Sequence, residues 1–196
     1  MQLLSLQLQS YPLKPFKHST ESFYTQCNTK QSPHIKIALG YVGVVEKEGN
    51  RGVVIDSINR KYAYIGAPYC ASFISWILNK ADKIKKVLTP KIRTARARKF
   101  ITKNSISASE VLLKKIKLSK KYIVIWGKGN TPFGHGGFTY KNWLNGKGQT
   151  IEANTSSGKK GSQRNGTGIW IRTRKIEPLN YFRIIAFTAI EYKGTN

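Results

Sequence analysis

The sequence predicts an α+β domain in which N-terminal helices pack on a mostly antiparallel sheet of about five strands. Helical periods dominate between residues 35 and 82, whereas short β-branched and aromatic runs separated by Gly and Asn dominate from residue 122 onward. A length of 196 residues and a hydrophobic content of 40% are enough for one domain with its own core.

Two segments depart from this pattern. Residues 1–33 are predicted to be an N-terminal extension of low regularity, with one short strand or helix near Leu3–Leu8, because prolines interrupt any period. Residues 34–196 are predicted to form the domain. Within it, residues 83–120 are a strongly basic insert, for which we expect a solvated surface or, alternatively, a face that binds polyanions.

Three helices are expected in the first half of the domain. The first runs from Ile35 to Glu48 and ends at Gly49-Asn50, and the second runs from Gly52 to Ala63. The third opens at the Gly66-Ala67-Pro68 turn and reaches Asp82. Pro68 suits the first turn of this helix, where its missing N–H costs nothing.

The basic insert and the second half contain shorter elements. Thr94–Arg98 predicts a short helix, and Ser107–Leu113 is weakly patterned. Five β-rich runs follow, with glycines and asparagines between them that supply turns. These runs are Tyr122–Trp126, Gly136–Lys141, Gln149–Thr155, Gly168–Thr173 and Phe182–Tyr192.

The charge is strongly positive. The chain has 34 Lys and Arg against 9 Asp and Glu, a net charge of +25. Such a surface favours polyanions such as nucleic acid, anionic lipid or a negatively charged cell wall. The net charge predicts that a partner is negatively charged but does not identify it. The alternative explanation of the charge is a general abundance of lysine that has no binding role.

The two cysteines, Cys27 and Cys70, do not predict a disulfide framework or a zinc site. No apolar run is long enough for a membrane span, and the first residues lack the basic start and cleavage site of a secretory signal. We therefore expect a protein made in the cytoplasm that is released or delivered by another route.

Cys70 falls in the first turn of the third predicted helix. The positive end of the helix dipole and the unpaired N–H groups there favour a thiolate, which is a nucleophile. The alternative is a small buried hydrophobe. A base elsewhere in the chain decides between the two.

His135 is the candidate base. It stands between Gly134 and Gly136 at the head of a predicted strand, whereas His18 and His34 lack a patterned partner and are expected to be exposed. Glu152 and Asn154 alternate along the next predicted strand and would point to one face. One of them would orient the imidazole while Cys70 attacks. The helix N-terminus would stabilise the oxyanion.

These residues also carry a resemblance to a known family. Gly66–Trp76 is similar to the G-x-P-[WY]-C-A-x-F-[VI]-S-W pattern of CHAP domains, the cysteine, histidine-dependent amidohydrolases/peptidases. Gly134–Phe138 resembles their G-H-V-G-[IVF] strand, and Ile151–Ser156 resembles their I-E-G-N-T-S strand. Gly43–Gly52 resembles the segment before their catalytic helix. Together these motifs cover about residues 35–190.

The resemblance implies a papain-like fold with a catalytic set of Cys70, His135, Glu152 and Asn154. It implies hydrolysis of an amide bond of peptidoglycan, by an N-acetylmuramoyl-L-alanine amidase or a peptidoglycan endopeptidase that serves as a phage lysin or an interbacterial toxin. Tyr69, Trp126, Gly134 and Gly136 are the residues that we expect to contact the substrate.

The sequence departs from the family at two places. Lys120-Lys121-Tyr122 stands where relatives carry Pro-Gly-Asp, and Asn59–Tyr69 contains no carboxylate. We therefore expect neither the calcium site of some relatives nor any other metal or cofactor.

The expected partners are peptidoglycan, anionic wall polymers, and a cognate inhibitor or delivery system, and we expect a monomer. The alternative function is a non-enzymatic basic module that binds nucleic acid or an anionic wall polymer.

Overall fold

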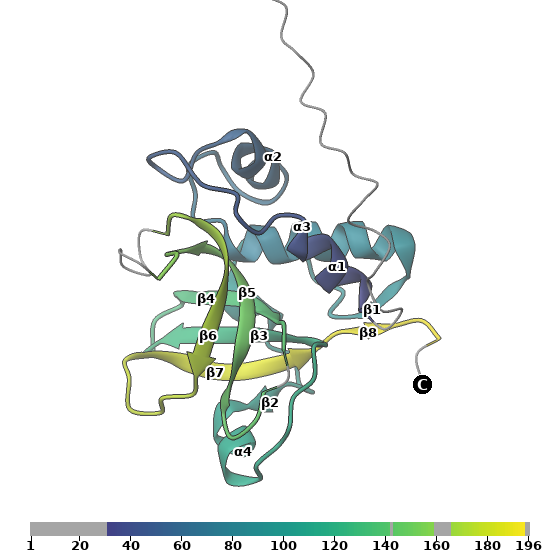
Figure 1. The fold of residues 1–196 in the computed structure, drawn as a ribbon, viewed down its shortest axis with the longest axis vertical. Helices are drawn as coiled ribbons and strands as arrows, with labels where there is room; N and C mark the ends of the chain where they lie inside the picture. The colour runs from purple at the N-terminus through teal and green to yellow at the C-terminus, as the bar shows by residue number, and fades with distance from the viewer. Residues whose placement is uncertain (1–30, 142, 159–165, 195–196) are drawn as a thin grey trace, which may run out of the picture. The chain divides into compact units, whose positions relative to one another are not determined.

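The structure, a computed structural model, describes residues 31–141, 143–158 and 166–194 (Figure 1). The chain divides into two units between residues 31 and 32. All the helices and strands that the structure describes belong to the second unit. The element expected near Leu3–Leu8 lies outside the described residues, as do His18 and Cys27.

A six-stranded antiparallel sheet forms the centre of this unit, with the strand order β2-β7-β3-β4-β5-β6. Five of the strands overlap the five predicted runs, so the prediction of an α+β domain with a mostly antiparallel sheet is confirmed. The strands are β2 (Ile106–Ser107), β3 (Tyr122–Lys128), β4 (Gly134–Thr139), β5 (Lys147–Thr155), β6 (Gly168–Lys175) and β7 (Phe182–Ala189).

The last predicted run is divided into two strands. Ile190 follows β7, and β8 (Glu191–Tyr192) then pairs with β1 (Val87–Thr89) in a separate two-stranded sheet. The sequence did not predict β1 or β2, because both are too short to show a period of two.

Helices cover both faces of the central sheet. Helix α3 (Cys70–Ile84) packs with α1 (Pro33–Leu39) and α2 (Val53–Tyr62) in one core, and α4 (Ala108–Leu113) belongs to the core of the other face (Figure 1). Strand β3 serves both cores, since Ile123 and Ile125 lie in the first while Val124 and Trp126 lie in the second. This explains why its sequence is apolar at consecutive positions instead of alternating.

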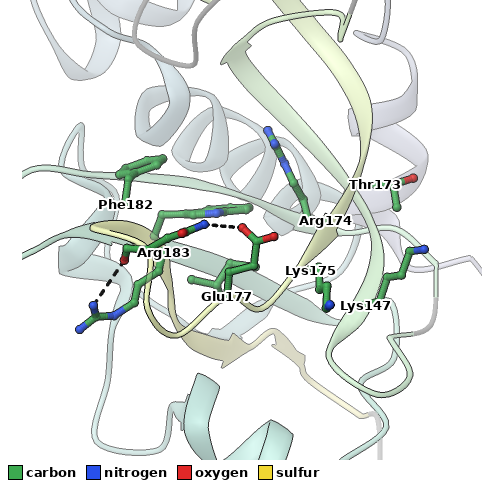
Figure 2. A pocket seen from close by; sticks show the side chains of 10 residues that line it. Lys147, Thr173, Arg174, Lys175, Glu177, Phe182 and Arg183 are labelled. Carbon is green, nitrogen blue, oxygen red and sulfur yellow. Dashed lines mark hydrogen bonds between the residues drawn. The ribbon is translucent and has the colours of Figure 1, made fainter.

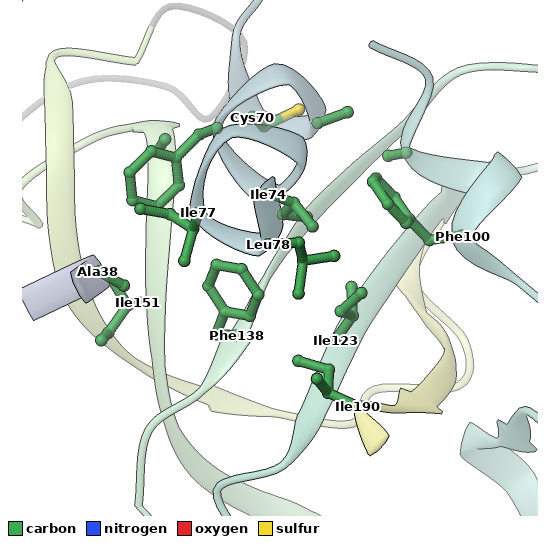
Figure 3. Close-up of a cluster of buried hydrophobic side chains, with 14 of the residues drawn as sticks. Ala38, Cys70, Ile74, Ile77, Leu78, Phe100, Ile123, Phe138, Ile151 and Ile190 are labelled. Carbon is green, nitrogen blue, oxygen red and sulfur yellow. The ribbon is translucent and has the colours of Figure 1, made fainter. Parts of the chain in front are cut away.

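Two of the three predicted helices agree with the structure. Helix α2 begins directly after Gly52 and ends before Ala63. Helix α3 starts at Cys70 with Tyr69 as its N-cap, so Pro68 precedes the helix and does not occupy its first turn. Figure 3 shows the sulfur of Cys70 at the start of α3 and the apolar side chains of later turns directed at the sheet.

The first predicted helix is wrong beyond Leu39. Helix α1 ends at Leu39 with Gly40 as its C-cap, and Gly43 has a φ of +93°, in the left-handed region that favours glycine. The N–H of Gly43 donates to the carbonyl of Ile169 at 2.9 Å, and Val45 forms an antiparallel bridge with Gly168. The apolar residues that suggested a longer helix therefore belong to a segment that pairs with the start of β6.

The basic insert is more than a solvated surface. It contains β1, β2, α4 and a 3₁₀-helix, η1 (Ala97–Phe100), so the predicted short helix begins three residues later than expected. Phe100 and Val111 are fully buried, whereas Arg96 and Lys99 are exposed. Ser107 and Glu110 form a capping box at the start of α4. The insert thus contributes to both cores and turns its charges outward.

His34 is buried, and the expectation that it is exposed is wrong. Its Nδ1 lies 2.7 Å from the hydroxyl of Tyr192, and its Nε2 lies 3.1 Å from the carbonyl of Lys120. Burial is the main cause that lowers the pKa of His34 to about 3, so the ring is neutral and links α1 to β8.

Within the described ranges, no helix is both long enough and apolar enough to cross a membrane.

Candidate active site

Cys70 occupies the first residue of α3, where backbone N–H groups of the first turn have no partner within the helix. The Gly66-Ala67-Pro68 turn fixes this start, because Gly66 has a φ of +87° and the side chain of Asn59 donates to the carbonyl of Ala67 at 2.8 Å. Cys70 is 7% exposed. The fold therefore holds a thiol at a helix N-terminus, close to the surface but largely protected from water.

The thiol of Cys70 and the imidazole of His135 are neighbours that shift each other's pKa. Burial opposes ionisation of this thiol. The interaction with His135 and its charge, together with the backbone N–H groups of Gly136 and Ala71, outweigh that cost and lower the pKa of Cys70. Burial likewise opposes the charge on His135, but its bonds to Cys70 and Glu152 raise its pKa to about 9. These opposite shifts favour a thiolate–imidazolium pair near neutral pH.

Glu152 accepts a hydrogen bond from the imidazole on the side away from the thiol. Its Oε2 lies 3.0 Å from Nε2 of His135, which leaves Nδ1 as the nitrogen that serves Cys70. The carboxylate is fully buried on β5, and Gly137 stands opposite it on β4. A Cβ atom at Gly137 would lie 2.7 Å from Cγ of Glu152. Glycine at this position therefore makes room for the carboxylate.

Arg174 on β6 is a member of the site that the sequence analysis missed. Its Nε and Nη2 donate to the two oxygens of Glu152 at 2.7 and 2.6 Å, a bidentate pair, and its guanidinium lies 5.7 Å from the ring centre of Trp126. Burial opposes the charge of Glu152, but the bonds from Arg174 and His135 hold its pKa far below the usual range. The hydroxyl of Thr150 also donates to this carboxylate, at 2.5 Å.

The four side chains form a row of alternating charge from α3 across β4 and β5 to β6. Cys70 as thiolate, His135 as imidazolium, Glu152 and Arg174 sum to zero. A buried charge is tolerated when it is paired and hydrogen-bonded, and every member of this row has an opposite neighbour. The row supplies a nucleophile, a proton carrier and a group that fixes the orientation of the carrier.

Asn154 lies close to the site but not in the predicted manner. The register of β5 shifts between Ala153 and Thr155, and Asn154 itself has a φ of +54°. The simple alternation that placed Glu152 and Asn154 on one face is therefore wrong, because a β-bulge interrupts it. The side-chain oxygen of Asn154 is buried without a hydrogen-bond partner among the described residues.

The four residues expected to contact substrate have packing roles in the structure. Tyr69 is fully buried and its hydroxyl donates to Glu46 at 2.8 Å, while the ring centre of Trp126 lies 5.1 Å from that of His135. A Cβ atom at Gly136 would lie 2.7 Å from Cδ1 of Ile74, and one at Gly134 would meet the carbonyl of Trp126. The glycines on either side of His135 thus let β4 approach α3 and β3 closely.

Metal ligands are not grouped in the part of the chain that the structure describes, where no three His, Cys, Asp or Glu side chains come together.

A comparison of the chain with family models, with curated proteins and with solved structures finds no match.

Proposed function

We propose that the chain is a cysteine hydrolase of amide bonds with a papain-like, CHAP-type fold. The observation that supports this most strongly is the contact of Cys70 with His135 at the N-terminus of α3, with Glu152 on the second imidazole nitrogen. A thiol, a histidine and an orienting acceptor in this order are the parts that nucleophilic acyl transfer requires.

In the proposed reaction the Cys70 thiolate attacks the carbonyl carbon of the amide. The oxyanion that forms accepts a hydrogen bond from the N–H of Cys70 at the start of α3. Nδ1 of His135 then donates its proton to the departing nitrogen, the C–N bond breaks and a thioester remains. His135 next takes a proton from water, whose oxygen attacks the thioester. The products are a free amine and a carboxylate, and the Cys70 thiolate is regenerated.

We infer that the substrate is bacterial peptidoglycan, cut at the sugar–peptide junction or within its peptides. The CHAP-like motifs around Cys70, His135 and Glu152 support this choice, and the net charge of +25 suits a negatively charged wall. The protein would then act in the periplasm or outside the cell, as a phage lysin or an interbacterial toxin.

Clearing of a suspension of purified cell wall tests this proposal. Cys70→Ala and His135→Ala should each abolish clearing while the far-UV circular dichroism spectrum remains that of the wild type. Cys27→Ala is the matched control, because it removes the other thiol and should leave clearing intact. Clearing by Cys70→Ala at the wild-type rate would exclude a Cys70 nucleophile.

The charge also supports a second candidate, a basic module that binds nucleic acid or a wall polymer without cleaving it. Its mark would be binding to DNA that falls steeply with salt and does not depend on Cys70. Wall clearing that requires Cys70 would argue against it as the main function.

A further inference from the structure

A pocket of about 420 Å³ is lined in part by Arg174, the ion-pair partner of the buried Glu152 (Figure 2). Its apolar part consists of Trp126, Phe182 and Ile184, which also contribute to the core on the α4 side of the sheet. Pockets of this volume typically enclose small ligands or single groups of a larger one.

The pocket adjoins the proposed catalytic residues through three of its own lining residues. The ring centres of Trp126 and Phe182 lie 5.1 and 6.5 Å from that of His135, and Arg174 bonds directly to Glu152. A group bound in the pocket is therefore separated from the catalytic residues by a single layer of side chains.

The polar part of the pocket is strongly basic. Lys147 and Lys175 face each other directly across β5 and β6, and Arg183 lies on β7. Like charges directly opposite in an antiparallel pair destabilise a sheet. Among the described residues neither lysine has an ion pair, and Glu177 is the one carboxylate that lines this pocket beside its four basic side chains.

The chain has few carboxylates with which to neutralise this pocket. Seven of its nine are already hydrogen-bonded, and the one that lines the pocket, Glu177, accepts from Asn180 at 2.5 Å. The residues that the structure does not describe contain a single acidic side chain, Glu21. An anion from outside the chain is the natural partner of the opposed lysines.

We propose that this pocket is a subsite for a carboxylate-bearing part of the substrate, the acidic stem peptide of peptidoglycan. The proposal rests on the proposed function. A carboxylate on a short aliphatic chain fits both parts of the pocket, since its methylenes can lie on Trp126 and Phe182 while its oxygens lie between the cations. A phosphate of a wall polymer carries the same charge, and the test below separates these two sources.

Binding is measured by calorimetry on Cys70→Ala, which removes turnover, with a soluble stem peptide that carries free carboxylates. Adding Lys147→Gln and Lys175→Gln should weaken binding by at least about tenfold, the cost of losing charge-assisted contacts. Lys83→Gln with Lys86→Gln is the control of equal charge. These exposed lysines lie in the last turn of α3 and just beyond it, roughly 20 Å from Cys70 along the helix, and their substitution should change the affinity by less than about twofold.

Three outcomes would overturn the proposed subsite. The Lys147/Lys175 variant could bind the peptide as tightly as Cys70→Ala alone, or the peptide with amidated carboxylates could bind as tightly as the free peptide. The third is that glycerol 3-phosphate binds in place of the peptide. Wall clearing by the wild-type protein separates this failure from that of the proposed function. Clearing with no lysine-dependent peptide binding refutes the subsite alone. Lysine-dependent binding without clearing supports the subsite and refutes the hydrolase.

Discussion

Glu152→Gln is the substitution that tests the charged row most sharply. The change keeps the size of the side chain and removes its charge. Glu152 is fully buried and bonds to two cations, Arg174 and His135, so the variant leaves a largely buried guanidinium without its counter-ion and leaves the imidazole with Cys70 alone.

The structure sets the expected size of this effect. Removing one partner of a buried ion pair costs about 3–5 kcal/mol, because the remaining charge stays desolvated. For a domain of this length, each kcal/mol lowers the melting temperature by about 2–4 °C. The melting temperature of Glu152→Gln should therefore fall by roughly 6–20 °C.

Differential scanning calorimetry at neutral pH measures this change. Glu191→Gln is the matched control, because this exposed carboxylate bonds to the Thr89 hydroxyl at 3.1 Å and its loss should cost less than about 0.5 kcal/mol. Arg174→Met should also destabilise on its own. The double variant of Glu152 and Arg174 should lose less unfolding free energy than the two single variants lose together, by about 0.5–3 kcal/mol.

Equal melting temperatures for Glu152→Gln and the wild type would refute the reasoning. So would strict additivity of the Glu152 and Arg174 substitutions, since residues that bond directly must couple.

Three further predictions concern the ionisable groups. Alkylation of Cys70 by iodoacetamide should persist below the pH at which a free thiol reacts, because the pKa of Cys70 is lowered, and His135→Ala should move the midpoint of this reaction to higher pH. The free energy of unfolding should fall less steeply between pH 6.5 and 9 than the titration of His135 alone would make it fall. Stabilisation by His135 is complete below 6.5 and is lost as the pH rises through its pKa of about 9, whereas stabilisation by Cys70, whose pKa is lowered, is lost as the pH falls, so the two trends oppose each other. Urea unfolding across this range measures it, and Cys70→Ala should make the decline steeper. Tyr192→Phe should cost about 1–3 kcal/mol, because Nδ1 of the buried His34 loses its partner at 2.7 Å, and it should leave alkylation of Cys70 unchanged; a change in alkylation would show that the two regions are coupled.

Strong local patterns predicted much of the fold. The i,i+4 spacing in α3 and the β-branched run in β3 each identify their element, since each repeats over several residues. The helix predicted beyond Leu39 is wrong because this segment instead pairs with Gly168 and Ile169, which lie more than a hundred positions away in the chain. Local periodicity carries no information about such partners.

The candidate site was predictable to the extent that its residues carry their own signals. Cys70 follows a helix-opening turn, His135 lies between glycines, and Glu152 interrupts an apolar strand. Arg174 has no such signal, as it lies just beyond the predicted strand and is one of 34 basic residues. The need for a counter-ion follows from the burial of Glu152 itself, which the structure shows and the alternation of the strand does not reveal.

Mass spectrometry of peptidoglycan fragments tests the central claim most directly. Purified wall digested by the wild-type protein should yield fragments with a new free amine and a new carboxylate at one type of amide bond, and digestion by Cys70→Ala should yield none. The same fragments from Cys70→Ala, or none from the wild-type protein, would contradict a Cys70-dependent amide hydrolase.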